Sequence, residues 1–162
     1  GQVFIKDFDP KTGWLWDQKM SVSRIGAPGQ AQAFKKINAL ELRLQLMQSD
    51  DMSAYGKTGE EKRKLTAKSD AVGLFMKQKP GEIRSIAESF IGVYAMTKTS
   101  FAEREDVSGE KMLEFANACI TQAKSTIADV IESMDASASG DLSAEDESKI
   151  ATVVKDVSVK MF

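Results

Sequence analysis

Residues 3–16 form the first patterned stretch of the chain, because β-branched and aromatic residues flank a turn-like sequence, Asp-Pro-Lys-Thr-Gly, at positions 9–13. Proline fixes φ and glycine tolerates positive φ, so this stretch predicts a short β-hairpin. Alternation places Trp14 and Trp16 on the same side of the second strand. Since a two-stranded hairpin is marginal alone, we expect both rings to pack on the helices or, alternatively, to form a docking patch for a partner protein.

The rest of the chain shows the spacing of amphipathic helices. After a linker at residues 21–29, apolar residues recur at positions i, i+3, i+4 and i+7. The expected helices cover about residues 29–49, 60–78, 82–99, 109–134 and 144–161. Short connections favour antiparallel packing, so the fold class predicted is all-α, a bundle of about five helices with a small N-terminal β-hairpin. We expect residues 1–28 to form the hairpin and linker, packed on the bundle, and residues 29–162 to form the helical domain.

Composition and charge describe one ordinary soluble domain. The chain has 162 residues, of which 42% are hydrophobic and 28% charged, and it contains neither a membrane-length apolar run nor a signal-peptide pattern. We therefore expect a soluble protein, cytoplasmic or exported without a signal peptide in this chain. The net charge of −2 combines +5 over residues 1–98 with −7 over residues 99–162. This asymmetry fits two binding faces or self-association, and it also fits simple variation in surface composition.

The residue types present exclude several kinds of active site. Without histidine, the chain cannot build a Ser-His-Asp or Cys-His nucleophile or a His-ligated zinc or haem site. Cys119 lies on an apolar helical stripe with no basic neighbour, which indicates a small buried residue. The cluster Glu103, Glu105 and Asp106 leaves a carboxylate-dependent hydrolase as an alternative. The basic start of the 60–78 helix follows two glutamates in a domain that is not basic, so nucleic acid is not expected as a partner.

Residues 135–146 carry the strongest motif in the chain. Oxygen-bearing side chains occupy positions 1, 3, 5, 7, 9 and 12 of this twelve-residue segment, with Gly140 at position 6 and Leu142 at position 8. These candidate metal ligands are Asp135, Ser137, Ser139, Asp141, Ser143 and Asp146. The segment resembles a single degenerate EF-hand loop, and with its flanking apolar positions the resemblance covers about residues 127–157. No family is recognised for the whole chain.

The EF-hand resemblance implies a calcium site of low affinity. Serines stand at positions 3 and 5 where the family has Asp or Asn, and Asp146 is shorter than the family's bidentate Glu. Affinity for calcium falls as the number of charged ligands falls, so the expected Kd is on the order of 10⁻⁴ to 10⁻³ M. The alternative is that Ser143, followed by Glu145 and Asp146, is simply the N-cap of the last helix.

These observations favour a non-enzymatic helical protein-interaction protein, such as an adaptor, an effector fragment or an assembly subunit. Its partner would be another protein or a second copy, with Trp14 and Trp16 as candidate contact residues. One alternative is a calcium-responsive helical protein with no cofactor other than Ca²⁺, and the other is the small hydrolase described above.

Overall fold

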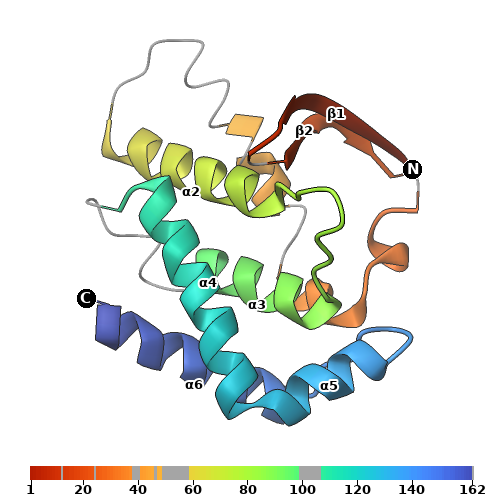
Figure 1. Cartoon of the computed structure of the whole chain (residues 1–162), viewed down its shortest axis with the longest axis vertical. Coiled ribbons are helices and arrows are strands. Elements are labelled where there is room, and N and C mark those ends of the chain that lie inside the picture. Colours follow the sequence, from red (N-terminus) through yellow and green to blue (C-terminus); the bar gives the residue numbers. More distant parts are fainter. Residues whose placement is uncertain are drawn as a thin grey trace.

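The structure is a computed structural model that describes residues 1–11, 13–23, 25–37, 41–45, 47–48, 59–98 and 107–161. It is predominantly helical with a small N-terminal hairpin, which confirms the predicted fold class (Figure 1). The α-helices are α2 (Glu60–Met76), α3 (Ile86–Thr97), α4 (Gly109–Thr126), α5 (Ala128–Ala136) and α6 (Ala144–Met161). Two short 3₁₀ helices, η1 (Ala27–Gly29) and η2 (Gln32–Lys36), precede helical residues at 41–45 and 47–48.

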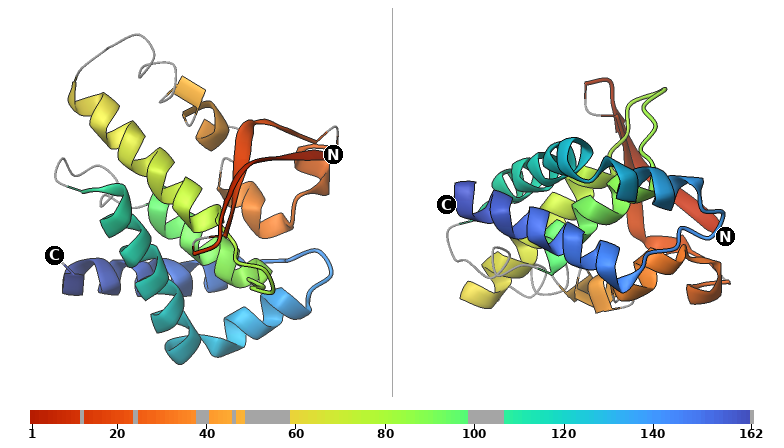
Figure 2. Two further views of the ribbon diagram at one scale, coloured as in Figure 1. Left: turned by 45° about the horizontal axis from the view of Figure 1, so that its top comes forward. Right: turned by 90° about the horizontal axis from the view of Figure 1, so that it is seen from below.

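The hairpin joins β1 (Gln2–Asp9) to β2 (Gly13–Val22) in antiparallel register, with Phe8 opposite Trp14. Gly13 has a φ of +93°, and an added Cβ there would lie 2.1 Å from the carbonyl oxygen of Gln78, so only glycine suits this position. The backbone N–H of Trp14 donates to that same oxygen at 3.1 Å. The turn of the hairpin therefore stands beside the α2–α3 loop, and both project from the helical body (Figure 2). The second strand extends to Val22, into residues predicted as linker.

The helix predicted over residues 29–49 begins differently, with two 3₁₀ turns. The N–H groups of Gln32 and Ala33 donate to the carbonyl oxygens of Ser139 at 2.8 Å and Gly140 at 3.0 Å. Both groups are thus bonded to the α5–α6 loop, a tertiary contact that no local pattern reveals. Residues 38–40, 46 and 49 of the predicted helix lie outside the described residues.

The helix predicted over residues 109–134 is two helices, because the chain breaks at Ile127, where φ is −136° and ψ is 44°. The hydroxyls of Ser125 and Thr126 both donate to the carbonyl oxygen of Gln122 at 2.8 Å. Such side-chain bonds compete with the helical ladder and favour a bend. The apolar stripe still continues through the break, since Ile127, the residue between the two helices, is buried in the same core.

The core is centred on α4, which contacts α2, α3, α5 and α6. Its apolar stripe is buried as predicted, and Cys119 is fully buried within it. Burial raises the pKa of the Cys119 thiol to about 12, so the group is a protonated, inert core residue at neutral pH. The largest fully buried side chains are Phe75, Phe90, Phe115, Ile91, Met96, Met112, Met134 and Ile150. Among the described helices, none is long and apolar enough to cross a membrane.

Candidate functional site

The EF-hand-like segment forms the connection between α5 and α6, and its side chains fall into separate groups. The hydroxyls of Ser137 and Ser139 donate to one carboxylate oxygen of Asp141, at 3.2 and 2.7 Å. Gly140 adopts the left-handed conformation with φ of +60°, as the position-6 glycine of such a loop requires. The structure therefore brings positions 3, 5 and 7 together around one carboxylate.

Ser143 and Asp146 form a second group at the start of α6. The Asp146 backbone N–H donates to the Ser143 hydroxyl oxygen at 3.0 Å, and that hydroxyl donates to the Asp146 carboxylate at 2.7 Å. The first of these bonds is that of a helix N-cap, and the second joins the side chains of the same two residues. Hydrogen bonds from Ser143 and then Lys149 hold the pKa of Asp146 below its usual value.

Asp135 is turned away from both groups, toward the start of α3. Its Oδ1 accepts the backbone N–H of Ala87 at 2.9 Å. Ser85 caps the same helix end, accepting the N–H of Glu88, while the Glu88 carboxylate accepts the N–H of Ser85. Lys124 on α4 forms an ion pair with Glu88 and holds the pKa of that carboxyl below its usual value.

The six predicted calcium ligands are thus divided among three local structures. Over the described ranges, no three or more acidic or cysteine side chains are grouped so that they could hold a metal ion. Calcium binding stays a prediction, and in this conformation Asp135 stabilises α3. The pattern Ser-x-x-Glu at 85–88 was the available signal for this helix start, and the predicted boundary at residue 82 missed it.

Replacing Asp135 with alanine is expected to lower the free energy of unfolding by about 1–2 kcal/mol, because the buried N–H of Ala87 loses its acceptor and the helix N-terminus loses a negative charge. Urea unfolding followed by circular dichroism measures this loss, with the exposed Glu132 on α5, changed to alanine, as the matched control. The loss should be the same in EDTA and in millimolar calcium. A loss found only with calcium present would instead establish Asp135 as an ion ligand.

The two tryptophans of the hairpin have different surroundings. Trp14 is 40% exposed, and its ring centroid lies 4.3 Å from that of Phe8. Trp16 is half-buried and lines two cavities beneath the hairpin. Of the two predicted partner-contact residues, Trp14 is thus placed at the surface, and Trp16 forms part of the wall between the hairpin and the helices.

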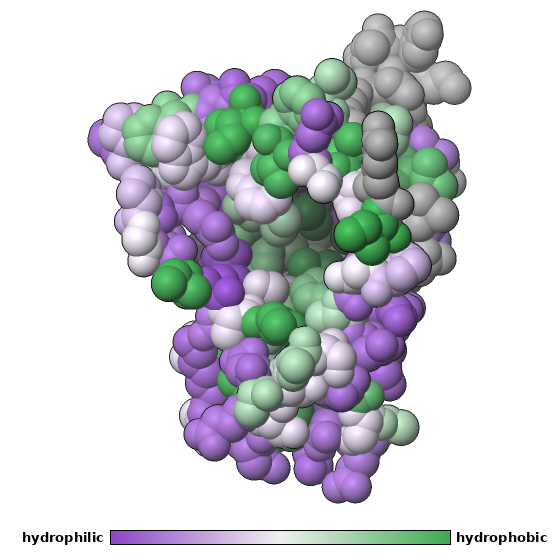
Figure 3. Space-filling view, turned by 90° about the vertical axis from the view of Figure 1, so that its right-hand side faces the viewer, coloured by the Kyte–Doolittle hydropathy of each residue, from purple (hydrophilic) through white to green (hydrophobic). Residues whose placement is uncertain are grey.

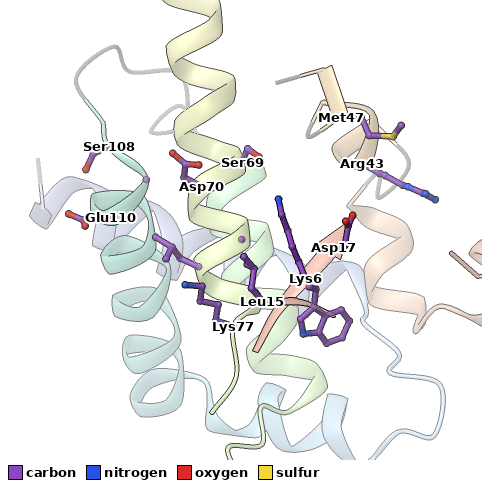
Figure 4. A pocket seen from close by; sticks show the side chains of 14 residues that line it. Lys6, Leu15, Asp17, Arg43, Met47, Ser69, Asp70, Lys77, Ser108 and Glu110 are labelled. Atoms are coloured by element: carbon purple, nitrogen blue, oxygen red, sulfur yellow. The ribbon is translucent and has the colours of Figure 1, made fainter. Parts of the chain in front are cut away.

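The larger cavity, of about 690 Å³, has a mixed lining of both charge signs. Figure 4 shows Lys6 and Asp17 of the hairpin on one side, Asp70 on α2, and Glu110 at the start of α4 on the other. Asp17, Asp70, Lys77 and Arg43 each have interaction partners in the structure. Most of the charged side chains of this cavity, which we call the charged cavity, therefore already have partners.

The smaller cavity, of about 410 Å³, is lined mainly by apolar side chains and is called the apolar cavity below. It lies between β2, η2 and the facing sides of α2 and α3, and the two cavities share Trp16 and Arg43. Two arginines, Arg43 and Arg84, stand in its otherwise largely apolar lining, and no sequence pattern singled out either of them. The acidic cluster Glu103, Glu105 and Asp106, on which the hydrolase alternative depended, lies outside the described residues.

Comparison with known proteins gives a weak and consistent similarity. No family model matches the chain. The chain is 28% identical over 161 residues to the ATP synthase subunit alpha of Neisseria meningitidis, an alignment covering 96% of this chain and 30% of the relative. The ATP synthase subunit alpha of Acinetobacter baylyi is 29% identical, with the same two coverages, and the ATP synthase subunit alpha 2 of Psychromonas ingrahamii is 28% identical. The chain thus spans about 30% of the length of the curated relatives it matches.

Proposed function

We propose that the chain is a non-enzymatic structural part of a multi-subunit assembly, and that it docks through its hairpin. The observation that carries this proposal is the apolar surface of residues 3–25, where most of the exposed large hydrophobic side chains in the described structure gather. We call this surface the hairpin patch. It consists of Val3, Phe4, Ile5, Phe8, Trp14, Met20, Val22 and Ile25.

The exposure of β1 on both faces supports docking. Every residue of β1 is exposed, so apolar side chains that alternate between the two faces of the strand all face solvent. A two-stranded sheet is only marginally stable in water unless one of its faces packs against another surface. Exposed apolar side chains concentrated on one element are typical of interaction surfaces, and large aromatic residues such as Phe8 and Trp14 contribute disproportionately to binding energy.

The similarity to ATP synthase alpha subunits supports the finer proposal that the assembly is of the ATP synthase type. Each of these relatives is named as a subunit of ATP synthase, and the similarity spans nearly the whole of this chain. This similarity favours an assembly subunit over an adaptor or an effector fragment. The partners proposed for the hairpin patch are therefore other protein parts of such an assembly.

Native isolation of the tagged natural protein from its own organism tests this proposal. We expect it to migrate with a large assembly that contains further proteins similar to ATP synthase subunits. The double variant Phe8→Ser, Trp14→Ser is expected to lower co-isolation at least about tenfold, because it removes two aromatic side chains that would be buried in the interface with the partner.

The matched control is Val159→Ser, because Val159 is an exposed apolar residue near the end of α6. Figure 1 shows that this end of α6 lies far from the hairpin. This variant should assemble normally. Thermal unfolding of the isolated proteins verifies that both variants retain the helical fold. A natural protein that migrates alone, or a double variant that assembles like the control, contradicts the proposal.

A further inference from the structure

The apolar cavity has the lining of a small-molecule site. Its wall is built by Trp16, Phe34, Leu42, Val72, Phe75 and Val93, which come from β2, η2, residues 41–45, α2 and α3. Its volume of about 410 Å³ is within the range of ligand pockets, about 300–1,000 Å³. Figure 3 shows hydrophobic residues gathered around a hollow on the face of the molecule that carries the hairpin. An apolar body would gain from leaving water here.

Arg84 supplies a charge at the wall of this cavity, and two contacts hold its guanidinium in place. Nη1 donates to the carbonyl oxygen of Phe75 at 2.5 Å, near the end of α2. The guanidinium carbon lies 4.0 Å from the centre of the Phe75 ring. A cation at a helix C-terminus and over an aromatic face is stabilised by both. These contacts use one of the five N–H donors of the guanidinium.

The described part of the chain provides no carboxylate in ion-pair contact with Arg84. Glu88 is close enough for the charge of Arg84 to lower its pKa, yet its carboxylate is bound to Lys124 and to the N–H of Ser85. Arg84 is half-buried, and a guanidinium prefers a planar carboxylate that accepts two parallel hydrogen bonds, so Arg84 is suited to bind one.

We propose that the apolar cavity binds an amphipathic carboxylate, a small molecule with an acyl or aryl body and one carboxylate. The body would lie against Trp16, Phe34 and Val72, and the carboxylate would accept hydrogen bonds from the donors of Arg84 that the protein leaves unused. This site is separate from the hairpin patch, and the inference does not depend on the proposed assembly.

Titration with octanoate and octanol tests the inference, because the two ligands share an apolar chain and differ in the charged group. The protein used is the chain carrying Trp14→Phe, so that the fluorescence of Trp16, in the cavity wall, is the sole tryptophan signal. Below its micelle-forming concentration, octanoate is expected to saturate the signal with an affinity at least about tenfold tighter than that of octanol, the effect of a charge-assisted hydrogen bond.

Arg84→Gln is expected to weaken octanoate binding at least about tenfold and to leave octanol binding within about twofold. Arg63→Gln, which removes an exposed arginine of α2 outside the cavity, should change neither. If Arg84→Gln fails to fold, Ser89→Leu provides a second variant, since a larger side chain in the wall should reduce the binding of both ligands. A signal that does not saturate, equal affinities for octanoate and octanol, or octanoate binding unaffected by the variant that folds overturns the inference.

Discussion

Replacing Phe90 with alanine is expected to lower the free energy of unfolding by about 3–5 kcal/mol. Phe90 is fully buried on α3. Its ring packs edge-to-face with that of Phe34, with centroids 5.8 Å apart, and is tilted against that of Tyr94, with centroids 5.5 Å apart. Truncation removes the transfer free energy of the ring and leaves a cavity that the surrounding helices can fill only in part. The loss is a large share of the roughly 5–15 kcal/mol that stabilises a typical domain.

Denaturant unfolding followed by far-ultraviolet circular dichroism measures this loss. The matched control is Ile83→Ala, because Ile83 is 92% exposed and its truncation should change the free energy by less than about 0.5 kcal/mol. Because η2 packs on α3 through Phe34, we also expect the Phe90 variant to loosen the segment that leads from the hairpin into the helices. A loss below about 1 kcal/mol would mean that Phe90 is not at the centre of the core.

The second large effect is expected at Gly92, where substitution by alanine should lower the free energy of unfolding by about 1–3 kcal/mol. Helix propensity alone predicts the opposite, a gain of about 0.5–1 kcal/mol when glycine inside a helix becomes alanine. The packing effect wins because an added Cβ would lie 2.2 Å from Cζ of Phe75, inside the contact between α2 and α3. The Phe75 ring, or one of the two helices, would have to move.

A double-mutant cycle with Phe75→Leu separates packing from propensity. The smaller side chain removes the ring that the new methyl group meets, so Gly92→Ala should cost less in the Phe75→Leu background than in the parent. Gly59→Ser is the control, because Gly59 has open space around its Cβ position and an extended φ of 165°. Additive effects of the Gly92 and Phe75 substitutions on the free energy of unfolding would contradict the close contact between these two residues.

The elements that local patterns define were predicted well from the sequence. The 9–13 turn sequence, with its proline and glycine, located the hairpin, and α2 and α6 begin and end within about two residues of the prediction. The buried stripe of α4, including Cys119, follows from apolar residues at helical spacing, since that spacing places them on one face. Gly140 was also located, because a loop of this pattern needs positive φ at that position.

Contacts between residues far apart in the chain decided the rest. The N–H groups of Gln32 and Ala33 bond to the α5–α6 loop, so a segment with a helical pattern begins as 3₁₀ turns. Asp135 has the spacing of a metal ligand, yet the free N–H at the start of α3 is its partner. Neither partner lies within the short window in which periodicity operates.

The amino-acid sequence by itself determined the helical class, the hairpin and the face that each helix buries, because these depend on side chains one to four positions apart. Only the tertiary structure decided which surfaces stay exposed and where a cavity forms. It left the hairpin patch exposed, formed the apolar cavity between β2, α2 and α3, and placed Arg84 in the wall of that cavity over Phe75. The physical reason is that a cavity or an uncovered patch arises from the way separate elements pack against one another, and patterns within one element do not determine that packing.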